Sequence, residues 1–453
     1  MDNCRREDAP VAKNSTNDDN HYVSIEKLRV GLYVFIDLPW FQHPFTLNHF
    51  RIANEEHIQT LRTLGQARFR YDPARSDALP DTTLTAPPPD TAPPVAASPT
   101  EIDDAALPPE DNPAMAAKQE RIRVLNEHRR RIEQVDKAFL KSSAILRNLN
   151  RNLLDKPNET LQEMSVLVDQ MVLSFLEHPE VTLHVMSEKN GGGDELYSHS
   201  LNVSVLSMML TKGLNFSPEQ ARILGLGALL HDIGLIEVPD RVLKKRPDEY
   251  TKPERDLRAM HCEFGLNIGK KLGLPPAVLA IIFQHHEMID GSGYPLGLKQ
   301  DKISLPARVV SLINFYDNLC NPLDLAQAMT PHEALSFMFG QRRNKFDAAV
   351  LQQMIRCLGV YPPGSIVTLS NNAIGMVISV NPLKPLRPWV ILYDESVPKE
   401  EAILLDLEQE PELIIAKALR PALLPPATYA YLSPRKRVTY YFDSSAQSTQ
   451  VKE

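Results

Sequence analysis

The pattern of apolar and polar residues divides the chain into segments of different character. Within residues 21–75, short strand-like runs at 32–36 and 67–71 flank a helical stretch over 54–64 that ends at Gly65. Short strands around one helix are typical of a small mixed domain. The pattern therefore predicts a small α+β unit at the start of the chain.

Two segments of different composition follow this unit. Residues 76–113 are rich in proline, alanine, aspartate and threonine, so they bury too little apolar surface to fold and predict an extended linker. Residues 114–160 are charged and helix-forming. Their apolar residues recur at roughly helical spacing: Ile122, Leu125, Ile132, Val135, Phe139 and Leu146. This predicts a connector helix region that packs one face against a neighbour or a second subunit, with an ordinary solvated helix as the alternative.

From 161 to 360 the signals of helices repeat. Ser217, Thr251 and Thr330 each precede a proline or a good helix former, with Gln or Glu three residues on, which predicts three capped helix starts. Residues 361–440 instead contain strand-like runs, at 365–369, 375–380 and 389–393. We therefore predict a mainly α fold with a small N-terminal α+β domain and a small β-rich C-terminal extension. Residues 1–20 are expected to be disordered, and 441–453 to form a tail.

Composition and charge narrow the setting. At 453 residues with 43% apolar content, the chain is long enough for two or three folded units. The four cysteines are scattered without paired spacing, which favours a reducing, cytoplasmic environment. The net charge of -8 argues against a nucleic-acid polymer as partner. No signal peptide is seen, and the apolar run at 223–230 is too short to cross a bilayer, so we expect a soluble protein with no membrane partner.

The main chemical signal is a cluster of seven ligand-type side chains. They are Glu195, His199, His231, Asp232, His261, His285 and His286. Glu195 and His199 are four residues apart, so on one helix they share a face. The pair His231 and Asp232 ends an apolar helix, His261 lies on the helix opened by Thr251, and the two remaining histidines close another. Lone buried histidines are usually satisfied core residues, but this clustering favours metal.

The donor set indicates which metals fit. Imidazole and carboxylate without thiolate suit iron or manganese better than structural zinc, and this set could hold two or three divalent ions. Asp232 can bridge two of them, and water between the cations becomes a nucleophile at neutral pH. We therefore assign His231 and Asp232 to the catalytic centre, for attack on a phosphodiester.

The loop after the last two histidines carries a family resemblance. The segment 285–295, with two glycines flanking a serine before Tyr-Pro, predicts a tight loop that leaves a helix end. Together with His231-Asp232-Ile233-Gly234, with His199 and with the helix at 307–309, it resembles the HD-GYP branch of the HD superfamily over about 194–358. The resemblance implies an HD-superfamily helical bundle that hydrolyses cyclic di-GMP to the linear dinucleotide or to GMP in bacterial signalling.

The resemblance also implies residue roles. The seven clustered side chains match metal ligands, Lys245 matches a lysine that can support the substrate, and the loop shapes the substrate cavity. The matching loop residues are Asp290, Gly291, Gly293, Tyr294 and Pro295. The segment at 21–75 resembles a domain often found before HD-GYP modules, which implies a regulatory or dimerising role. Signalling proteins and a second copy of the chain are thus the expected macromolecular partners.

Three departures from the family pattern weaken the expected handling of phosphate. Leu235 replaces a lysine, Asn314 replaces a metal-binding aspartate, and the segment from Cys320 to Leu323 replaces one that supplies an arginine. Asp317, one turn after Asn314, suits a supporting position better than a ligand position. Loss of one charged stabiliser can lower a rate on the order of 100-fold.

Three hypotheses follow from these matches and departures. The first is a metal-dependent cyclic di-GMP phosphodiesterase. The second is a catalytically degenerate HD-GYP protein that acts by binding nucleotide or partner proteins. The third is an HD-type phosphohydrolase that acts on another nucleotide, because a fold alone does not fix the substrate.

Overall fold

The computed structural model describes most of the chain between residues 21 and 442. The described ranges are 21–38, 43–45, 48–77, 84–85, 133–144, 155–177, 183–185, 195–380, 384–395, 402–434 and 438–442, with single positions between 123 and 153 and at 397 and 399. For 84–85, 183–185 and 195–198 the description covers the backbone. The predicted disordered N-terminus and most of the predicted linker and tail lie outside these ranges. The chain divides into two compact units, Met1–Arg123 and Val124–Glu453.

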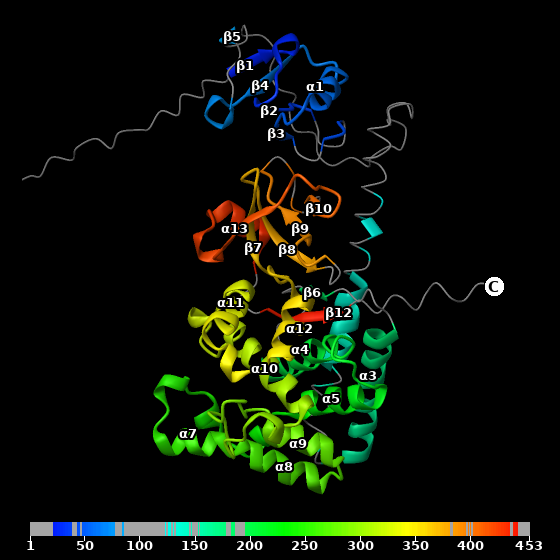
Figure 1. The fold of residues 1–453 in the computed structure, drawn as a ribbon, viewed down its shortest axis with the longest axis vertical. Coiled ribbons are helices and arrows are strands. Elements are labelled where there is room, and N and C mark those ends of the chain that lie inside the picture. Colours follow the sequence, from blue (N-terminus) through cyan, green and yellow to red (C-terminus); the bar gives the residue numbers. More distant parts are fainter. Residues whose placement is uncertain are drawn as a thin grey trace, which may run out of the picture. The chain divides into compact units, whose positions relative to one another are not determined.

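The first unit is an antiparallel sheet with one helix, drawn in blue in Figure 1. Its elements are β1 (His21–Ser24), β2 (Tyr33–Phe35), β3 (His49–Arg51), α1 (Glu55–Arg62), β4 (Arg68–Tyr71) and β5 (Leu84–Thr85), with strand order β3-β2-β4-β1-β5. Ile58 and Leu61 of α1 pack with Val34 and Phe69 in one core. The Asn54 side chain accepts a hydrogen bond from the backbone N–H of His57 and so caps α1. The predicted α+β unit is confirmed, and β5 extends its sheet into the segment predicted as linker.

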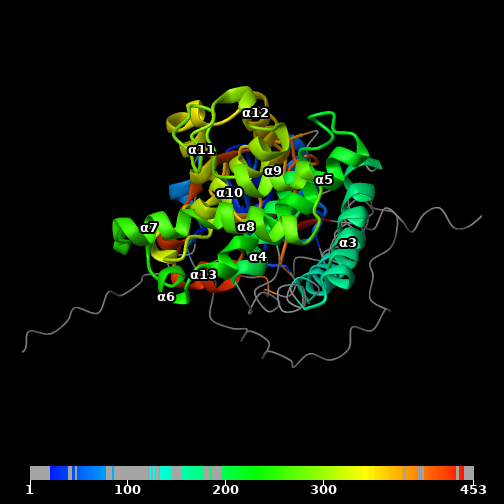
Figure 2. The same ribbon diagram turned by 90° about the horizontal axis from the view of Figure 1, so that it is seen from below.

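The second unit is built mainly from helices (Figures 1 and 2). They are α3 (Pro157–Glu177), α4 (Glu195–Met209), α5 (Pro218–Leu230), α6 (Asp240–Leu243), α7 (Lys252–Ala259), α8 (His261–Lys271), α9 (Pro276–Gln284), α10 (Leu305–Cys320), α11 (Pro331–Gln341) and α12 (Ala348–Leu358). Helix α10 packs against α4, α5, α9, α11 and α12, so it lies at the centre of the bundle. Its Val309, Val310, Ile313 and Tyr316 are fully buried.

The helix starts follow the sequence signals, with one difference. Ser217, Thr251 and Thr330 each form a capping box, as predicted. The helix that Thr251 opens ends at Ala259, however, and His261 begins a separate helix, α8. Met260 is the C-cap residue of α7, and its backbone N–H donates to carbonyl groups in the last turn of that helix. Helix α7 therefore ends just before His261.

The connector region contributes to the core of the second unit. Residues 133–144 are helical, and Val135, Phe139 and Leu146 are buried in the same apolar cluster as residues of α3, α4, α5 and α10. The helical spacing in the sequence therefore does mark a packed face. The predicted apolar positions Ile122, Leu125 and Ile132 lie outside the described residues.

A second sheet combines β6 (Leu183–Val185), which lies between α3 and α4 in sequence, with strands that follow the helices. These strands are β7 (Ile366–Leu369), β8 (Ile374–Val380), β9 (Trp389–Leu392), β10 (Leu404–Asp406), β11 (Ile415–Leu419) and β12 (Tyr440–Phe442), and α13 (Pro426–Leu432) packs beside the sheet. The predicted β-rich extension is confirmed. Strand β12 reaches two residues into the segment assigned to the tail, because the aromatic side chains of Tyr441 and Phe442 are buried in the helical core. No helix in the described part of the chain is long and apolar enough to cross a bilayer.

Gly234 brings two parts of the bundle unusually close together. It lies in a short 3₁₀ helix, η5 (Ile233–Glu237), that directly follows Asp232 and packs on α8. A Cβ atom at this position would lie 1.9 Å from the His261 carbonyl oxygen and 2.4 Å from the Gly265 nitrogen. Only glycine therefore lets the backbone after Asp232 approach the start of α8.

Replacing Gly234 with alanine should destabilise the helical unit. The new methyl group meets the backbone of α8, which cannot rotate away, so we expect a loss of about 3 kcal/mol and a lower melting temperature. Gly340→Ala is the matched control, since Gly340 is exposed in α11 with open space around its Cβ. That variant should gain up to about 1 kcal/mol of helix stability. Equal melting temperatures for the two variants would contradict the close approach.

Candidate metal centre

Two groups of possible metal ligands lie side by side and share Asp232. The members of the groups are His199, His231 and Asp232 in one, and Asp232, His261, His285 and His286 in the other. Within each group the donor atoms lie within 4.8 Å of one another. Six of the seven predicted ligands are thus brought together. Glu195 begins α4, but its side chain lies outside the described residues, so its role as a ligand stays a prediction.

The carboxylate of Asp232 faces both groups at once. Its Oδ1 lies 3.3 Å from Nε2 of His261 and 3.5 Å from Nε2 of His285. Its Oδ2 lies 3.5 Å from Nε2 of His231 and 3.8 Å from Nε2 of His199. Burial raises the pKa of Asp232, but the charge interaction with His231 and the hydrogen bonds from His261 and His285 outweigh it. The pKa of Asp232 therefore lies well below its usual value. This is the arrangement of a carboxylate that bridges two cations.

Backbone carbonyls at helix ends fix the orientation of three histidine rings. In each ring Nδ1 lies 2.6 to 2.8 Å from the carbonyl oxygen three residues earlier: His231 on Ala228, His261 on Arg258 and His285 on Ile282. Because a carbonyl can only accept, Nδ1 carries the proton and donates it, and Nε2 keeps its lone pair. The last turn of a helix leaves carbonyls without intrahelical partners, so these helix ends supply the acceptors.

The free lone pairs face each other in pairs. Nε2 of His199 lies 3.2 Å from Nε2 of His231, and Nε2 of His261 lies 3.2 Å from Nε2 of His285. Two lone pairs at this distance repel, whereas two nitrogens bound to one cation at about 2.1 Å and at right angles are about 3 Å apart. Each pair therefore has the spacing of adjacent ligands on one ion.

Burial keeps several of these histidines neutral. It lowers the pKa of His231 to about 3 and also lowers the pKa values of His285 and His286. A neutral imidazole binds metal without first losing a proton, so these rings are ready to ligate at neutral pH. Cys262 lies 3.6 Å from Nε2 of His261, but burial raises the pKa of its thiol far above the usual value. The donor set is therefore nitrogen and oxygen.

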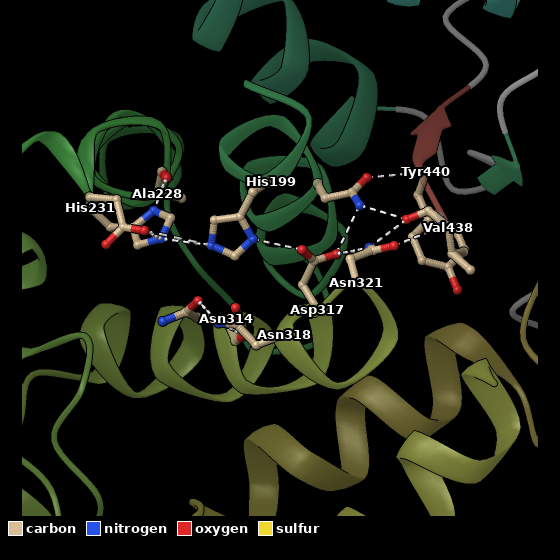
Figure 3. A network of polar contacts seen from close by, with 11 residues as sticks. His199, Ala228, His231, Asn314, Asp317, Asn318, Asn321, Val438 and Tyr440 are labelled. Carbon is tan, nitrogen blue, oxygen red and sulfur yellow. Dashed lines mark hydrogen bonds and ion pairs between the residues drawn. The ribbon is translucent and has the colours of Figure 1, made fainter. Parts of the chain in front are cut away.

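His199 is held by a carboxylate instead of a carbonyl. Its Nδ1 donates to Oδ2 of Asp317 at 2.6 Å, which leaves Nε2 free to face His231 (Figure 3). Burial lowers the pKa of His199, but the hydrogen bond and the charge of Asp317 more than offset this effect and raise it overall. Asp317 is buried and accepts from Asn202 and Asn321 through its other oxygen. It thus supports a ligand, which is the position that the sequence favoured for it.

The loop after α9 supports His286. The ring of Tyr294 stacks on His286, with centroids 4.5 Å apart. A Cβ atom on Gly293 would lie 2.4 Å from the His286 carbonyl oxygen, and Gly291 has a φ of 82°, so both glycines are required by the backbone. Asp290 accepts from the backbone N–H of Ser292 and forms a turn that precedes Pro295.

Glu287, which the sequence analysis did not single out, closes this loop from inside. Its carboxylate is 2% exposed and accepts from the backbone N–H groups of Leu296 at 2.7 Å and Leu298 at 2.8 Å. The residue lies directly after His286, inside the recognised motif, so the motif could have indicated it. The two backbone N–H groups that donate to its carboxylate could not be predicted from the sequence.

A cavity of about 460 Å³ opens over the ligands. Its lining includes His199, Asp232 and His286, and it receives an apolar wall from Leu235. Asn314 also lines it, with Oδ1 accepting from Asn318 at 2.7 Å.

Two cations that the sequence did not indicate, Lys244 and Arg258, lie in this lining. Lys245, the predicted substrate contact, instead donates to Glu254. Arg258 could have been found from spacing, since it is one helical turn before His261.

Comparison with known families matches three regions of the chain. The HD domain family matches residues 149–350. This part of the chain is therefore an HD domain. A domain of unknown function, DUF3391, matches residues 21–163, and a KOW domain associated with HD domains matches residues 366–425.

The alignment with one curated relative extends beyond the HD domain. A cyclic di-GMP phosphodiesterase of Pseudomonas aeruginosa is 28% identical over 374 residues, which are 82% of this chain and 84% of that protein. The cyclic di-GMP phosphodiesterase response regulator RpfG of Xanthomonas campestris pv. campestris is 29% identical over 212 residues, 45% of this chain and 55% of that protein. Among solved structures, an HDG"Y"P protein from Bdellovibrio bacteriovorus is 16% identical, with a TM-score of 0.40, over 74% of this chain and 97% of that one.

Glu287→Ala should loosen the loop that supports His286. The change leaves two buried backbone N–H groups without an acceptor, so we expect a loss of about 2 to 3 kcal/mol and faster proteolysis within 288–298. Glu287→Gln keeps one acceptor oxygen and should lose less. Glu263→Ala on the exposed face of α8 is the matched control and should stay within about 0.5 kcal/mol of the wild type. Unfolding curves and limited proteolysis measure both effects, and identical curves for Glu287→Ala and the control would contradict the role of Glu287.

Proposed function

We propose that this HD-domain protein is a metal-dependent phosphodiesterase that hydrolyses cyclic di-GMP to the linear dinucleotide or to GMP, in bacterial second-messenger signalling. The observation that carries the proposal is the single carboxylate of Asp232 between two sets of metal-ready histidines. The two curated relatives described above are named cyclic di-GMP phosphodiesterases, and one of them aligns over most of its length, which supports the choice of substrate.

The ligand set favours two or three divalent cations, iron or manganese before zinc. The two groups around Asp232 would hold two ions, and Glu195 would complete a position next to His199. Nitrogen and oxygen donors without thiolate suit these metals. Bound cations would supply the Lewis acidity that activates water and neutralises phosphate charge.

The side chains of the cavity then have separable roles. Nε2 of His199, Nε2 of His231 and Oδ2 of Asp232 face one position. The group of His261, His285 and His286, with Oδ1 of Asp232, faces the other. Leu235 and its apolar neighbours keep water away from one wall. Arg258 can donate to a phosphate oxygen, because among the described residues its guanidinium has no acidic partner within ion-pair distance.

We also propose that the protein lies in the cytoplasm. We assign the unit at 21–75 a regulatory or dimerising role toward signalling partners or a second copy of the chain. The match of this region to a domain that precedes the HD domain supports that role.

The test is metal analysis of the full chain beside turnover of cyclic di-GMP with Mn²⁺ or Fe²⁺. We expect at least two metals per chain and measurable turnover. Asp232→Ala should lose most of the metal at both positions, and His285→Ala should lose about one metal, since only one group contains His285. Both should reduce turnover at least about 100-fold. His332→Ala, in α11 and outside the cavity lining, is the matched control with unchanged metal and turnover.

Other outcomes select other functions. Metal-free protein without turnover would overturn the proposal. Tight binding of cyclic di-GMP without hydrolysis would select a degenerate HD-GYP protein, a reading that Leu235 in the cavity wall and the uncharged Asn314 favour. Faster hydrolysis of another cyclic dinucleotide would select a phosphohydrolase of different specificity.

Arg258→Gln should weaken substrate binding with little effect on metal content. A hydrogen bond to a charged phosphate contributes about 1.5 to 3 kcal/mol, so the KM for cyclic di-GMP should rise about 10- to 100-fold. Arg255→Gln, on the exposed face of the same helix, is the matched control. An unchanged KM in Arg258→Gln, or an equal change in both variants, would remove Arg258 from the substrate site.

A further inference from the structure

The edge of the C-terminal sheet is closed by side chains of the helical domain. Strand β12 lies at the end of its sheet, next to β6. On its other side the N–H of Tyr440 donates to Oδ1 of Asn202 at 2.7 Å, and the N–H of Val438, two residues before the strand, donates to Oδ1 of Asn321 at 2.7 Å. The Val438 carbonyl accepts from both amides at 2.8 Å. Two asparagines thus take the place of a neighbouring strand.

The same two amides hold the carboxylate behind His199. Nδ2 of Asn202 donates to Oδ1 of Asp317 at 2.8 Å, and Nδ2 of Asn321 donates to the same oxygen at 2.9 Å. Asp317 then accepts from His199 through its other oxygen (Figure 3). Backbone of β12, two amides, one carboxylate and one imidazole therefore form a continuous chain of hydrogen bonds to the metal centre.

The orientation of each amide is fixed by this arrangement. An amide oxygen can only accept and an amide nitrogen can only donate. If either asparagine flipped, its nitrogen would face a backbone N–H and its oxygen would face the Asp317 carboxylate. The backbone of β12 consequently sets which atoms are presented to Asp317.

The strand itself is anchored in the helical core. The hydroxyl of Tyr440 lies 3.0 Å from that of Tyr316 in α10, and the ring of Phe442 packs on Phe175 in α3. The hydroxyl of Tyr441 lies 2.6 Å from the hydroxyl of Ser142 in the connector region. The position of β12 is therefore defined independently of the two asparagines.

The support is asymmetric between the two ligand groups. His231, His261 and His285 are oriented by carbonyls of their own helix ends. Among the described ligands, His199 is the one whose ring depends on a segment more than 200 residues away in sequence.

We propose that β12 is a positioning element of the metal centre, and that it sets the affinity of the position around His199 and His231 while leaving the position around His261 and His285 unchanged. Asn202, Asn321 and Asp317 are positioning residues that transmit this effect. The inference rests on the proposed metal centre and is independent of which cyclic dinucleotide is hydrolysed.

The test is a Mn²⁺ titration of the full chain, followed by electron paramagnetic resonance. Asn321→Ala removes one donor to Asp317 and both bonds to Val438, and it leaves every histidine in place. Loss of a group that orients a metal ligand commonly lowers affinity 10- to 100-fold. We expect that loss at one Mn²⁺ position and an unchanged affinity at the other. Tyr441→Phe is the matched control, because it removes a hydrogen bond from the same strand without touching the amides.

The outcomes separate this inference from the proposed function. Wild-type protein that binds no Mn²⁺ overturns the metal centre and the inference together. Two unchanged affinities in Asn321→Ala, with Mn²⁺ bound as in the wild type, overturn the inference alone. Equal losses in Asn321→Ala and Tyr441→Phe also overturn it, since they would reflect general weakening of the strand. Melting curves with chelator present establish that both variants are folded.

Amide hydrogen exchange provides a reciprocal readout. If β12 favours metal at His199, then metal must favour the bound position of β12 by the same free energy. Mn²⁺ should therefore slow exchange in the peptide that contains Val438 and Tyr440 in the wild type, and should do so less in Asn321→Ala. Exchange in this peptide that is independent of Mn²⁺ in the wild type would overturn the coupling.

Discussion

The partly buried carboxylate of Asp232 among the facing histidine nitrogens is the interaction on which the rest of the site depends. A charge in such a place is stable only when it is paired or binds a cation, and neutral imidazoles supply partial compensation at best. The four nearby Nε2 atoms cannot satisfy one another because each keeps a lone pair toward the centre. Divalent cations resolve both problems at once, since each is attracted by the carboxylate and accepts the lone pairs.

The fold delivers these groups by bringing helix ends together. The ends of α5, α7 and α9 provide the carbonyls that orient His231, His261 and His285. The glycine at 234 lets the turn after Asp232 lie directly on α8, so the carboxylate reaches between the two groups. Central α10 adds Asn314 and Asp317 from the opposite side. Most of the contributing residues thus lie in a packed helix or at its cap, and His286 lies in the turn that follows α9.

Much of the fold could be predicted because its signals are local. Capping boxes at Ser217, Thr251 and Thr330 depend on four consecutive residues, and the strand patterns of the C-terminal sheet depend on five or six. The histidine cluster was visible for the same reason, since its members lie at helix ends that the sequence marks. The sequence predicted that Asp232 can bridge two cations. It could not predict the distances between the Asp232 oxygens and the histidine nitrogens.

The remaining features depend on contacts between distant segments. Lys244 follows the last residue of α6 and lines the cavity, whereas its neighbour Lys245 pairs with Glu254 of α7, so the tertiary contacts of this turn separate the two lysines. Arg258 faces the cavity because α7 ends where it does. The pairing of Asn202 and Asn321 with β12 joins residues up to 238 positions apart, and no local pattern encodes it.

The place of β12 in the chain has a consequence for biosynthesis. The histidines proposed as ligands all leave the ribosome well before Val438 and Tyr440, because they precede strands β7 to β12 in the sequence. A nascent chain can therefore form its helices and gather these histidines while His199 still lacks the support of β12. Under the proposed role of β12, full metal loading would be a late event in maturation, and a chain interrupted after β7 but before β12 would carry these histidines yet lack a finished centre.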